Sequence, residues 1–129
     1  MVLLDTCVLL WIAEGDLGRL SGPALEQLNA RPWAVSTLSA WEIGIKCASG
    51  KLALKSSPQA WWAEATRFHQ LIPLDFTPPM ALRAASLPAI HADPFDRGLI
   101  ATALERTVAL VTPDERIRSY ASVGVSVVW

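Results

Sequence analysis

Val2-Leu3-Leu4-Asp5-Thr6 opens the chain with a short apolar run that ends at a carboxylate and a hydroxyl. Such a run is typical of a buried strand, and the two polar residues after it suit the start of a helix. The same arrangement returns at Trp33-Ala34-Val35, which runs into Ser36-Thr37, and at 108–111, which runs into Thr112-Pro113. Short apolar strands that each lead into a helix predict a parallel sheet with helical crossovers.

The rest of the chain continues this alternation. We expect strands over 2–4, 33–35, 71–74, 108–111 and 125–129. We expect helices over 6–13, 21–30, 39–49, 58–69, 79–87 and 93–106, and another that opens at Thr112-Pro113. Ser39-Ala40-Trp41-Glu42 matches a capping box, which would begin the third helix. The sequence therefore predicts one α/β domain over 1–129, an α/β/α sandwich around a short-stranded, mostly parallel sheet.

Composition excludes several classes of protein. Among 129 residues, 52% are hydrophobic and 18% are charged, which excludes a disordered chain. The net charge of −1 argues against tight, sequence-blind binding of nucleic acid. It does not exclude an enzyme that cuts RNA, because metal ions can supply the positive charge that phosphates need. The six tryptophans indicate either a well-filled core or an apolar surface that a partner covers.

The chain also lacks the marks of a secreted or membrane protein. Two cysteines, Cys7 and Cys47, are too few for a disulfide framework or a structural zinc site. No signal peptide precedes the first predicted strand, and no run approaches the ~18 apolar residues of a membrane span. We expect a cytoplasmic protein with no membrane association.

Carboxylates stand where the predicted strands end and the helices begin. Asp5 ends the first strand, Glu42 lies near the start of the helix after the second, and Asp114 follows the fourth. Asp93 and Asp96 stand in the first turn of another helix and share one face of it. Because strand ends and helix starts meet at one edge of a parallel sheet, these acids can converge there.

Helix capping offers a simpler explanation for most of these acids, since carboxylates favour the first turn of a helix. Glu42 could complete the box with Ser39, Glu115 could do the same for Thr112, and Asp93 could be an N-cap. Asp5 is hardest to explain in this way, because a carboxylate directly after a buried run needs a partner or a metal. Several acids with no Cys or His spacing favour Mg²⁺ or Mn²⁺ over zinc, which suits phosphoryl transfer.

The motifs together resemble PIN-domain ribonucleases, and most closely the VapC-like toxins of type II toxin–antitoxin systems. The most specific stretch is His91-Ala92-Asp93-Pro94-Phe95-Asp96-Arg97. The other matching stretches are Leu3-Leu4-Asp5-Thr6, Ser39-Ala40-Trp41-Glu42-Ile43, Leu99-Ile100-Ala101-Thr102-Ala103 and Leu110-Val111-Thr112-Pro113-Asp114. They occur in the order of the family and cover the whole chain.

The resemblance implies a Mg²⁺- or Mn²⁺-dependent endoribonuclease whose metal ligands and catalytic acids are Asp5, Glu42, Asp96 and Asp114. Asp96 is aligned with the third acid because Ala103 follows it at the usual spacing, and Asp93 is the alternative one helical turn away. Cys7 stands where relatives commonly have His or Ser, which touches no ligand position.

Four further residues are candidates for support of the acids or contact with substrate: Thr6, His91, Arg97 and Thr112. His91 could assist proton transfer or hold the loop, and Arg97 could contact phosphate or pair with a neighbouring acid. The two threonines could orient the acids or only cap helices. Trp61 and Trp62 could stack bases, although their helical spacing favours packing.

The expected partners are an RNA substrate, a cognate antitoxin and a second copy of the chain in a homodimer. Two other functions remain open at this point. A phosphohydrolase outside the toxin class could use Asp5 as a covalent nucleophile, although a D-x-D pattern would favour that more than Asp5-Thr6-Cys7 does. A catalytically inactive PIN-like interaction module would have lost acids, and all four positions are acidic here.

Overall fold

Five strands form the central sheet of the computed structural model, which describes all 129 residues. They are β1 (Val2–Leu4), β2 (Trp33–Ser36), β3 (Ile72–Leu74), β4 (Ala109–Val111) and β5 (Val127–Val128). The order across the sheet is β3-β2-β1-β4-β5, so that the proline-containing strand β3 lies at an edge, as predicted. All neighbouring strands pair in parallel. The predicted α/β fold is confirmed, and the sheet is parallel throughout.

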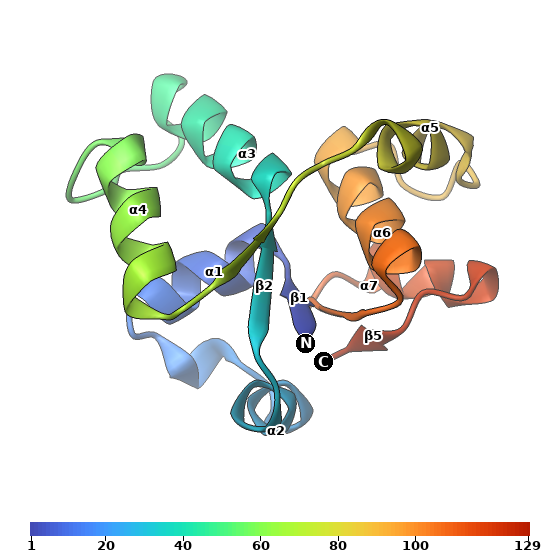
Figure 1. The fold of residues 1–129 in the computed structure, drawn as a ribbon, viewed down its shortest axis with the longest axis horizontal. Coiled ribbons are helices and arrows are strands. Elements are labelled where there is room, and N and C mark those ends of the chain that lie inside the picture. Colours follow the sequence, from blue (N-terminus) through green and yellow to red (C-terminus); the bar gives the residue numbers. More distant parts are fainter.

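Seven α-helices connect and cover these strands. They are α1 (Thr6–Ala13), α2 (Gly22–Ala30), α3 (Thr37–Ala48), α4 (Pro58–Phe68), α5 (Pro78–Ser86), α6 (Pro94–Arg106) and α7 (Glu115–Arg118). In Figure 1, α1, α3 and α4 lie on one side of the strands, and α5, α6 and α7 lie on the other. Two short 3₁₀ turns, Leu17–Arg19 and Ser119–Val123, were not predicted. None of the helices has the length and apolar character needed to cross a membrane.

The sheet has a separate hydrophobic cluster on each face. Alternate residues of β1 point to opposite faces, so Val2 and Leu4 join one cluster and Leu3 joins the other. The first cluster lies under α1 and α2, and the second lies under α6. Five of the six tryptophans pack against the first cluster: Trp11, Trp33, Trp61, Trp62 and Trp129. Core packing therefore accounts for most of the tryptophans, including the pair Trp61 and Trp62.

Helices α3 and α6 approach each other closely at Gly98. A Cβ atom at Gly98 would overlap Cδ1 of Leu38 in α3, so only glycine allows this contact without a shift. The approach places the first turn of α6 beside α3. Acids carried by these two helices are thereby brought together.

The predicted capping box at Ser39 is wrong. Helix α3 begins at Thr37, and its N-cap is Ser36, whose hydroxyl oxygen accepts from the backbone N–H of Leu38. Strand β2 runs one residue further than predicted, so the chain enters the helix directly from the strand. The hydroxyl of Ser39 is instead buried and lies 2.9 Å from that of Thr6. Glu42 is thereby released from any capping role.

The closing strand is shorter than predicted and covers Val127–Val128, although the carbonyl of Ser126 still accepts a hydrogen bond of 2.8 Å from the N–H of Leu110 in β4. Gly124 adopts a positive φ of 96° at the end of the preceding 3₁₀ turn. Val125 then packs into the second cluster in place of extending the strand.

Candidate active site

A polar pocket of about 320 Å³ lies where β1 and β4 end and α3 and α6 begin. Its lining residues are Asp5, Thr6, Cys7, Glu42, Lys46, Asp93, Asp96, Pro113 and Asp114. All five acids singled out from the sequence are among them. Four segments that are far apart in the sequence therefore bring carboxylates to one place, at the edge of a parallel sheet where ligands bind.

Asp5 is held in place by Thr112, from the end of the neighbouring strand. Thr112 Oγ1 donates a hydrogen bond of 2.5 Å to Oδ2 of Asp5 and accepts one of 3.1 Å from the N–H of Asp114. Burial raises the pKa of Asp5, the charge of Glu42 adds to this rise, and the Thr112 bond opposes it. Thr112 thus orients one acid directly and the backbone of another, as the expected supporting role requires.

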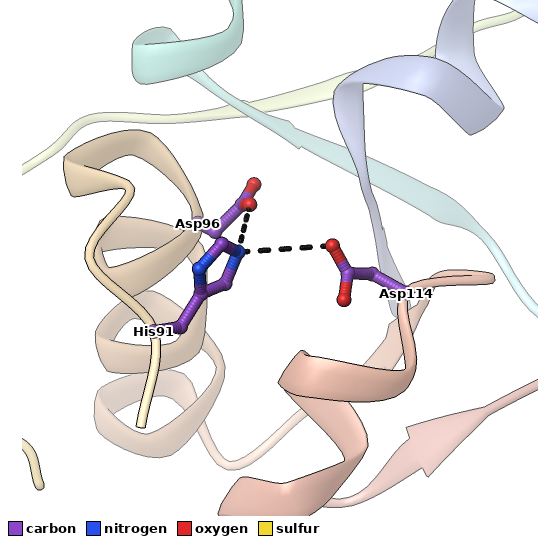
Figure 2. A group of neighbouring side chains, drawn as sticks. All are labelled: His91, Asp96 and Asp114. Atoms are coloured by element: carbon purple, nitrogen blue, oxygen red, sulfur yellow. Dashed lines mark hydrogen bonds and ion pairs between the residues drawn. The ribbon is translucent and has the colours of Figure 1, made fainter. Parts of the chain in front are cut away.

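Asp96 projects from the first turn of α6 toward His91 and Asp114 (Figure 2). His91 Nε2 lies 2.6 Å from Oδ2 of Asp96 and 3.7 Å from Oδ2 of Asp114. Burial, followed by the charges of Asp5 and Asp93, raises the pKa of Asp96 to about 7, against the opposing effect of His91. The charges of Asp5 and Asp93 therefore disfavour the ionised form of Asp96, and a bound cation would relieve this repulsion.

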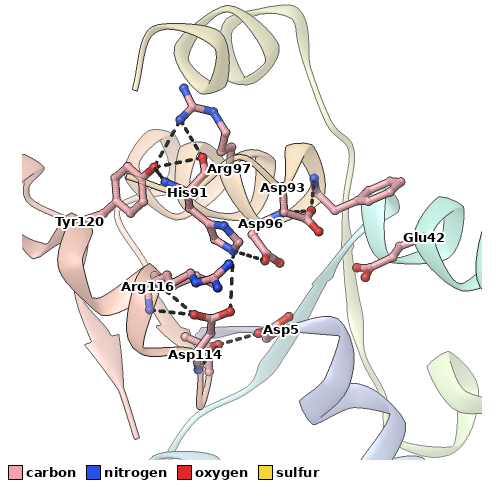
Figure 3. A network of polar contacts seen from close by, with 12 residues as sticks. Asp5, Glu42, His91, Asp93, Asp96, Arg97, Asp114, Arg116 and Tyr120 are labelled. Carbon is pink, nitrogen blue, oxygen red and sulfur yellow. Dashed lines mark hydrogen bonds and ion pairs between the residues drawn. The ribbon is translucent and has the colours of Figure 1, made fainter. Parts of the chain in front are cut away.

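His91 is a buried residue held by its backbone. Its N–H donates to the hydroxyl oxygen of Tyr120 at 2.8 Å (Figure 3), and the Tyr120 hydroxyl donates to the carbonyl of Pro88 at 2.8 Å. Tyr120 is fully buried and was not singled out from the sequence. These bonds fix the loop before α6, so the imidazole is presented to the acids in one orientation.

Arg97 supports the same loop from behind and does not line the pocket. Its guanidinium donates to the carbonyl oxygens of Ala84, Leu87, Pro88 and His91 at 2.8 to 3.1 Å. It forms no ion pair, so of the two alternatives for Arg97 the pairing with a neighbouring acid is wrong. The physical reason is that carbonyls at the end of α5 and in the loop after it point toward the guanidinium, whose five donors can serve several of them at once.

Asp93 and Asp114 each cap a helix with one oxygen. Asp93 Oδ1 accepts from the N–H groups of Phe95 at 2.8 Å and Asp96 at 3.2 Å. Asp114 Oδ1 accepts from the N–H of Arg116 at 2.7 Å, and its Oδ2 faces His91. Asp114 therefore takes the capping role that Thr112 and Glu115 could have shared, and it still offers an oxygen to the pocket.

Glu42 is the most unusual acid of the group. Its Oε2 pairs with Nζ of Lys46 at 2.7 Å, while its Oε1 is buried and has no hydrogen-bond partner. A buried carboxylate oxygen without a partner is rare and indicates a missing ligand. Lys46, the only cationic residue lining the pocket, was missed from the sequence, although its i,i+4 spacing from Glu42 on a helix was readable.

Thr6 and Cys7 complete the wall. The Thr6 hydroxyl joins that of Ser39 and so ties the start of α1 to α3. Burial, with the neighbouring charge of Asp5, raises the pKa of the Cys7 thiol far above its ordinary value. Cys7 is therefore a neutral thiol at physiological pH, which disfavours a role as a nucleophile.

The donor set fits a hard divalent cation. His91, Asp96 and Asp114 each offer one ligand atom, and these atoms lie within 4.8 Å of one another. The carboxylates of Asp5 and Glu42 line the same pocket, and Oε1 of Glu42 has no hydrogen-bond partner. Carboxylate oxygens are the ligands that Mg²⁺ and Mn²⁺ prefer. The residues present could thus hold a metal ion.

Comparison with known proteins gives a family match over most of the chain. The family model for the PIN domain matches residues 2–123. Ribonuclease VapC22 of Mycobacterium tuberculosis is 31% identical over 130 residues, which cover 99% of this chain and 98% of the relative.

Solved structures share the fold. A toxin–antitoxin complex from Klebsiella pneumoniae has a TM-score of 0.61 at 19% identity, covering 100% of this chain and 97% of that one. VapBC2 from Rickettsia felis, bound to a DNA fragment from its promoter, has a TM-score of 0.63 at 14% identity, with 98% and 97% covered. FitAcB from Neisseria gonorrhoeae has a TM-score of 0.61 at 20% identity, with 98% and 96% covered.

Proposed function

The chain belongs to the PIN-domain family and is a VapC-like ribonuclease toxin of a toxin–antitoxin system, and we propose that its acidic pocket cuts RNA phosphodiester bonds with Mg²⁺ or Mn²⁺. The proposed ligands are the carboxylates Asp5, Glu42, Asp96 and Asp114, within one nuclease domain over residues 1–129. The observation that carries this proposal is the buried, unpartnered Oε1 of Glu42 in a pocket with four other acids. Such a pocket is electrostatically unfavourable until a cation enters it.

When bound in such a site, a divalent ion polarises the phosphoryl oxygens and makes a water molecule a better nucleophile. The chain's own residues prepare the site for that chemistry. Thr112 fixes the carboxylate of Asp5, and His91 fixes that of Asp96. Asp114 keeps one oxygen for the pocket because its own helix holds the other. Donors that hold carboxylates in place are a general requirement of metal sites.

We further propose an antitoxin as the partner protein, since the structural neighbours include toxin–antitoxin complexes. We also propose a homodimer. An apolar groove of about 380 Å³ runs beside the acidic pocket, and it is lined by residues that include Leu38, Trp41, Phe76 and Phe95. Trp41 is 63% exposed there, a large apolar area for a tryptophan to present to water. A cytoplasmic location follows from an RNA substrate.

Expression without an antitoxin tests the function in a cell. We expect growth to slow and new RNA ends to appear within minutes of induction, because cleavage precedes any general stress. The Asp5→Asn variant should relieve both effects at equal protein level. If Asp5→Asn stays folded and equally toxic, metal-dependent cleavage is not the cause of toxicity.

A further inference from the structure

Lys46 is the one positive group in a pocket of negative groups. It lies one helical turn beyond Glu42 on α3, and its Nζ is 2.7 Å from Oε2 of that residue. The Lys46 side chain is 43% exposed, whereas that of Glu42 is 10% exposed. The ammonium group therefore lies at the mouth of the pocket, between the buried acid and the solvent.

Lys46 lies among carboxylates. Glu42, Asp93 and Asp96 line the same pocket, and Nζ of Lys46 contacts Oε2 of Glu42 at 2.7 Å. Three acids thus attract the ammonium group of Lys46, and one of them, Glu42, forms an ion pair with it. Its single tight contact is with Glu42, the acid whose other oxygen has no partner.

No other lysine or arginine lines the pocket. Arg97 uses its donors on carbonyls at the end of α5 and in the loop after it. Arg116 is exposed at the start of α7 and lies beside Asp114 on the His91 side (Figure 3), and it is not among the residues that line the pocket. A negatively charged RNA backbone that enters this acidic site needs a cation at its entrance, and Lys46 is the one lysine or arginine that lines the pocket.

We propose that Lys46 is the residue that binds the RNA phosphate, and that Glu42 holds it ready in the metal-free protein. When Glu42 takes a divalent ion, it gives up the ammonium group of Lys46, which is then free to contact a non-bridging phosphate oxygen. A lysine suits this exchange because its ammonium is a compact charge on a flexible stem and can turn without movement of the helix. The inference rests on the proposed function, since it names a further residue for the same reaction.

The proposal makes two predictions of opposite sign for Lys46→Met. Loss of the ammonium frees Glu42 and removes a positive charge beside the metal ligands, so Mn²⁺ should bind about threefold more tightly. Loss of the phosphate contact should raise the KM for RNA about tenfold at saturating Mn²⁺, with kcat much less changed. A residue with only a structural role would not improve metal binding while it impairs substrate binding.

The test measures Mn²⁺ affinity of the purified full chain without RNA, by electron paramagnetic resonance titration, and RNA cleavage kinetics separately. Lys46→Arg keeps the charge and should retain a KM near that of the wild type. Lys51→Met removes an exposed lysine outside the pocket and serves as the matched control. If Lys46→Met melts well below the wild type, Lys46→Gln replaces it.

Unchanged or weakened Mn²⁺ binding in Lys46→Met overturns the proposal, and so does an unchanged KM. An equal rise of KM in Lys51→Met also overturns it, because a general effect of net charge would then explain the result. A wild-type protein that binds Mn²⁺ and cleaves no RNA contradicts the proposed function itself. A wild-type protein that cleaves RNA, with a Lys46→Met variant that matches it in both assays, contradicts only the role of Lys46.

Discussion

The hydroxyl of Thr112 donates a 2.5 Å hydrogen bond to Oδ2 of Asp5, and 107 residues separate the two in the sequence. The bond joins the ends of β1 and β4, the two neighbouring strands whose following residues supply Asp5 and Asp114 to the pocket. Both residues are buried, which strengthens the contact relative to one in water. One hydroxyl therefore sets the position of the acid that the pocket desolvates most.

Thr112→Val tests this contact with almost no change of shape. We expect a loss of stability of about 1–3 kcal/mol, because a buried acceptor loses its donor. Since the hydrogen bond opposes the rise in the pKa of Asp5, its loss should raise that pKa further. The variant should then need about tenfold more Mg²⁺ for half-maximal cleavage. Thermal melting and a Mg²⁺ titration of cleavage measure the two effects.

The control for this variant is Thr66→Val, whose hydroxyl donates to carbonyls of its own helix α4, away from the pocket. It should leave the Mg²⁺ requirement unchanged. An equal Mg²⁺ requirement in Thr112→Val and the wild type would show that the bond does not orient Asp5.

Asp93 and Asp96 should respond differently to the same substitution. Asp93→Asn should change cleavage by less than about threefold, because asparagine caps a helix about as well as aspartate. Asp96→Asn should lower cleavage at least about a hundredfold, since it removes a proposed metal ligand held by His91. The assay is Mg²⁺-dependent RNA cleavage at equal protein concentration. Loss of activity in Asp93→Asn with activity kept in Asp96→Asn would make Asp93 the metal-site acid.

Metal-free stability should depend on pH through Asp96. The folded protein keeps a proton on Asp96 up to about pH 7, whereas the unfolded chain releases it near the ordinary value of 3.8. The folded state therefore binds more protons in this range, and the contribution of Asp96 to stability falls as pH rises from about 4 to about 7. In the presence of EDTA, the melting temperature of Asp96→Asn relative to the wild type should rise across that range. A constant difference between the two proteins from pH 4 to pH 8 would contradict the raised pKa.

The convergence of the acids was predictable because a parallel sheet has simple rules. Asp5 and Asp114 follow neighbouring strands, and every strand of this sheet ends at the same edge. Local signals also served well at α6, where Asp93-Pro94 predicts the N-cap and first residue that the structure shows. The signal at Ser39 failed because Ser36 and Ser39 are both good caps, and only the length of β2 decides between them.

The contacts between side chains were beyond the reach of sequence patterns. Arg97 stands in the most specific motif, yet its partners are carbonyls at the end of α5 and in the following loop, whose positions depend on the path of the chain. Tyr120 enters the same network from a 3₁₀ turn that no periodicity marks. The contact of His91 with Asp96 depends in turn on that network, so its geometry required the assembled fold.

The oligomeric state of the protein tests whether the apolar groove is the interface of the proposed homodimer. We expect the isolated protein to be a dimer by light scattering at micromolar concentration. Trp41→Ser should be a monomer, because the substitution removes the large exposed apolar ring that lines the groove. Phe68→Ser is the control, since Phe68 is similarly exposed on α4 and lies outside the groove. A dimer that survives Trp41→Ser places the interface elsewhere, and a strictly monomeric wild type contradicts the homodimer.

Cleavage of RNA by the purified protein, freed of any antitoxin, tests the central claim most directly. We predict that Mg²⁺ or Mn²⁺ supports endonucleolytic cuts, that EDTA abolishes them, and that restored metal brings them back. Asp5→Asn should be inactive at every metal concentration while it melts as a folded protein. Cleavage that persists in EDTA, or that Asp5→Asn retains in full, would contradict an acidic metal centre as the site of the reaction.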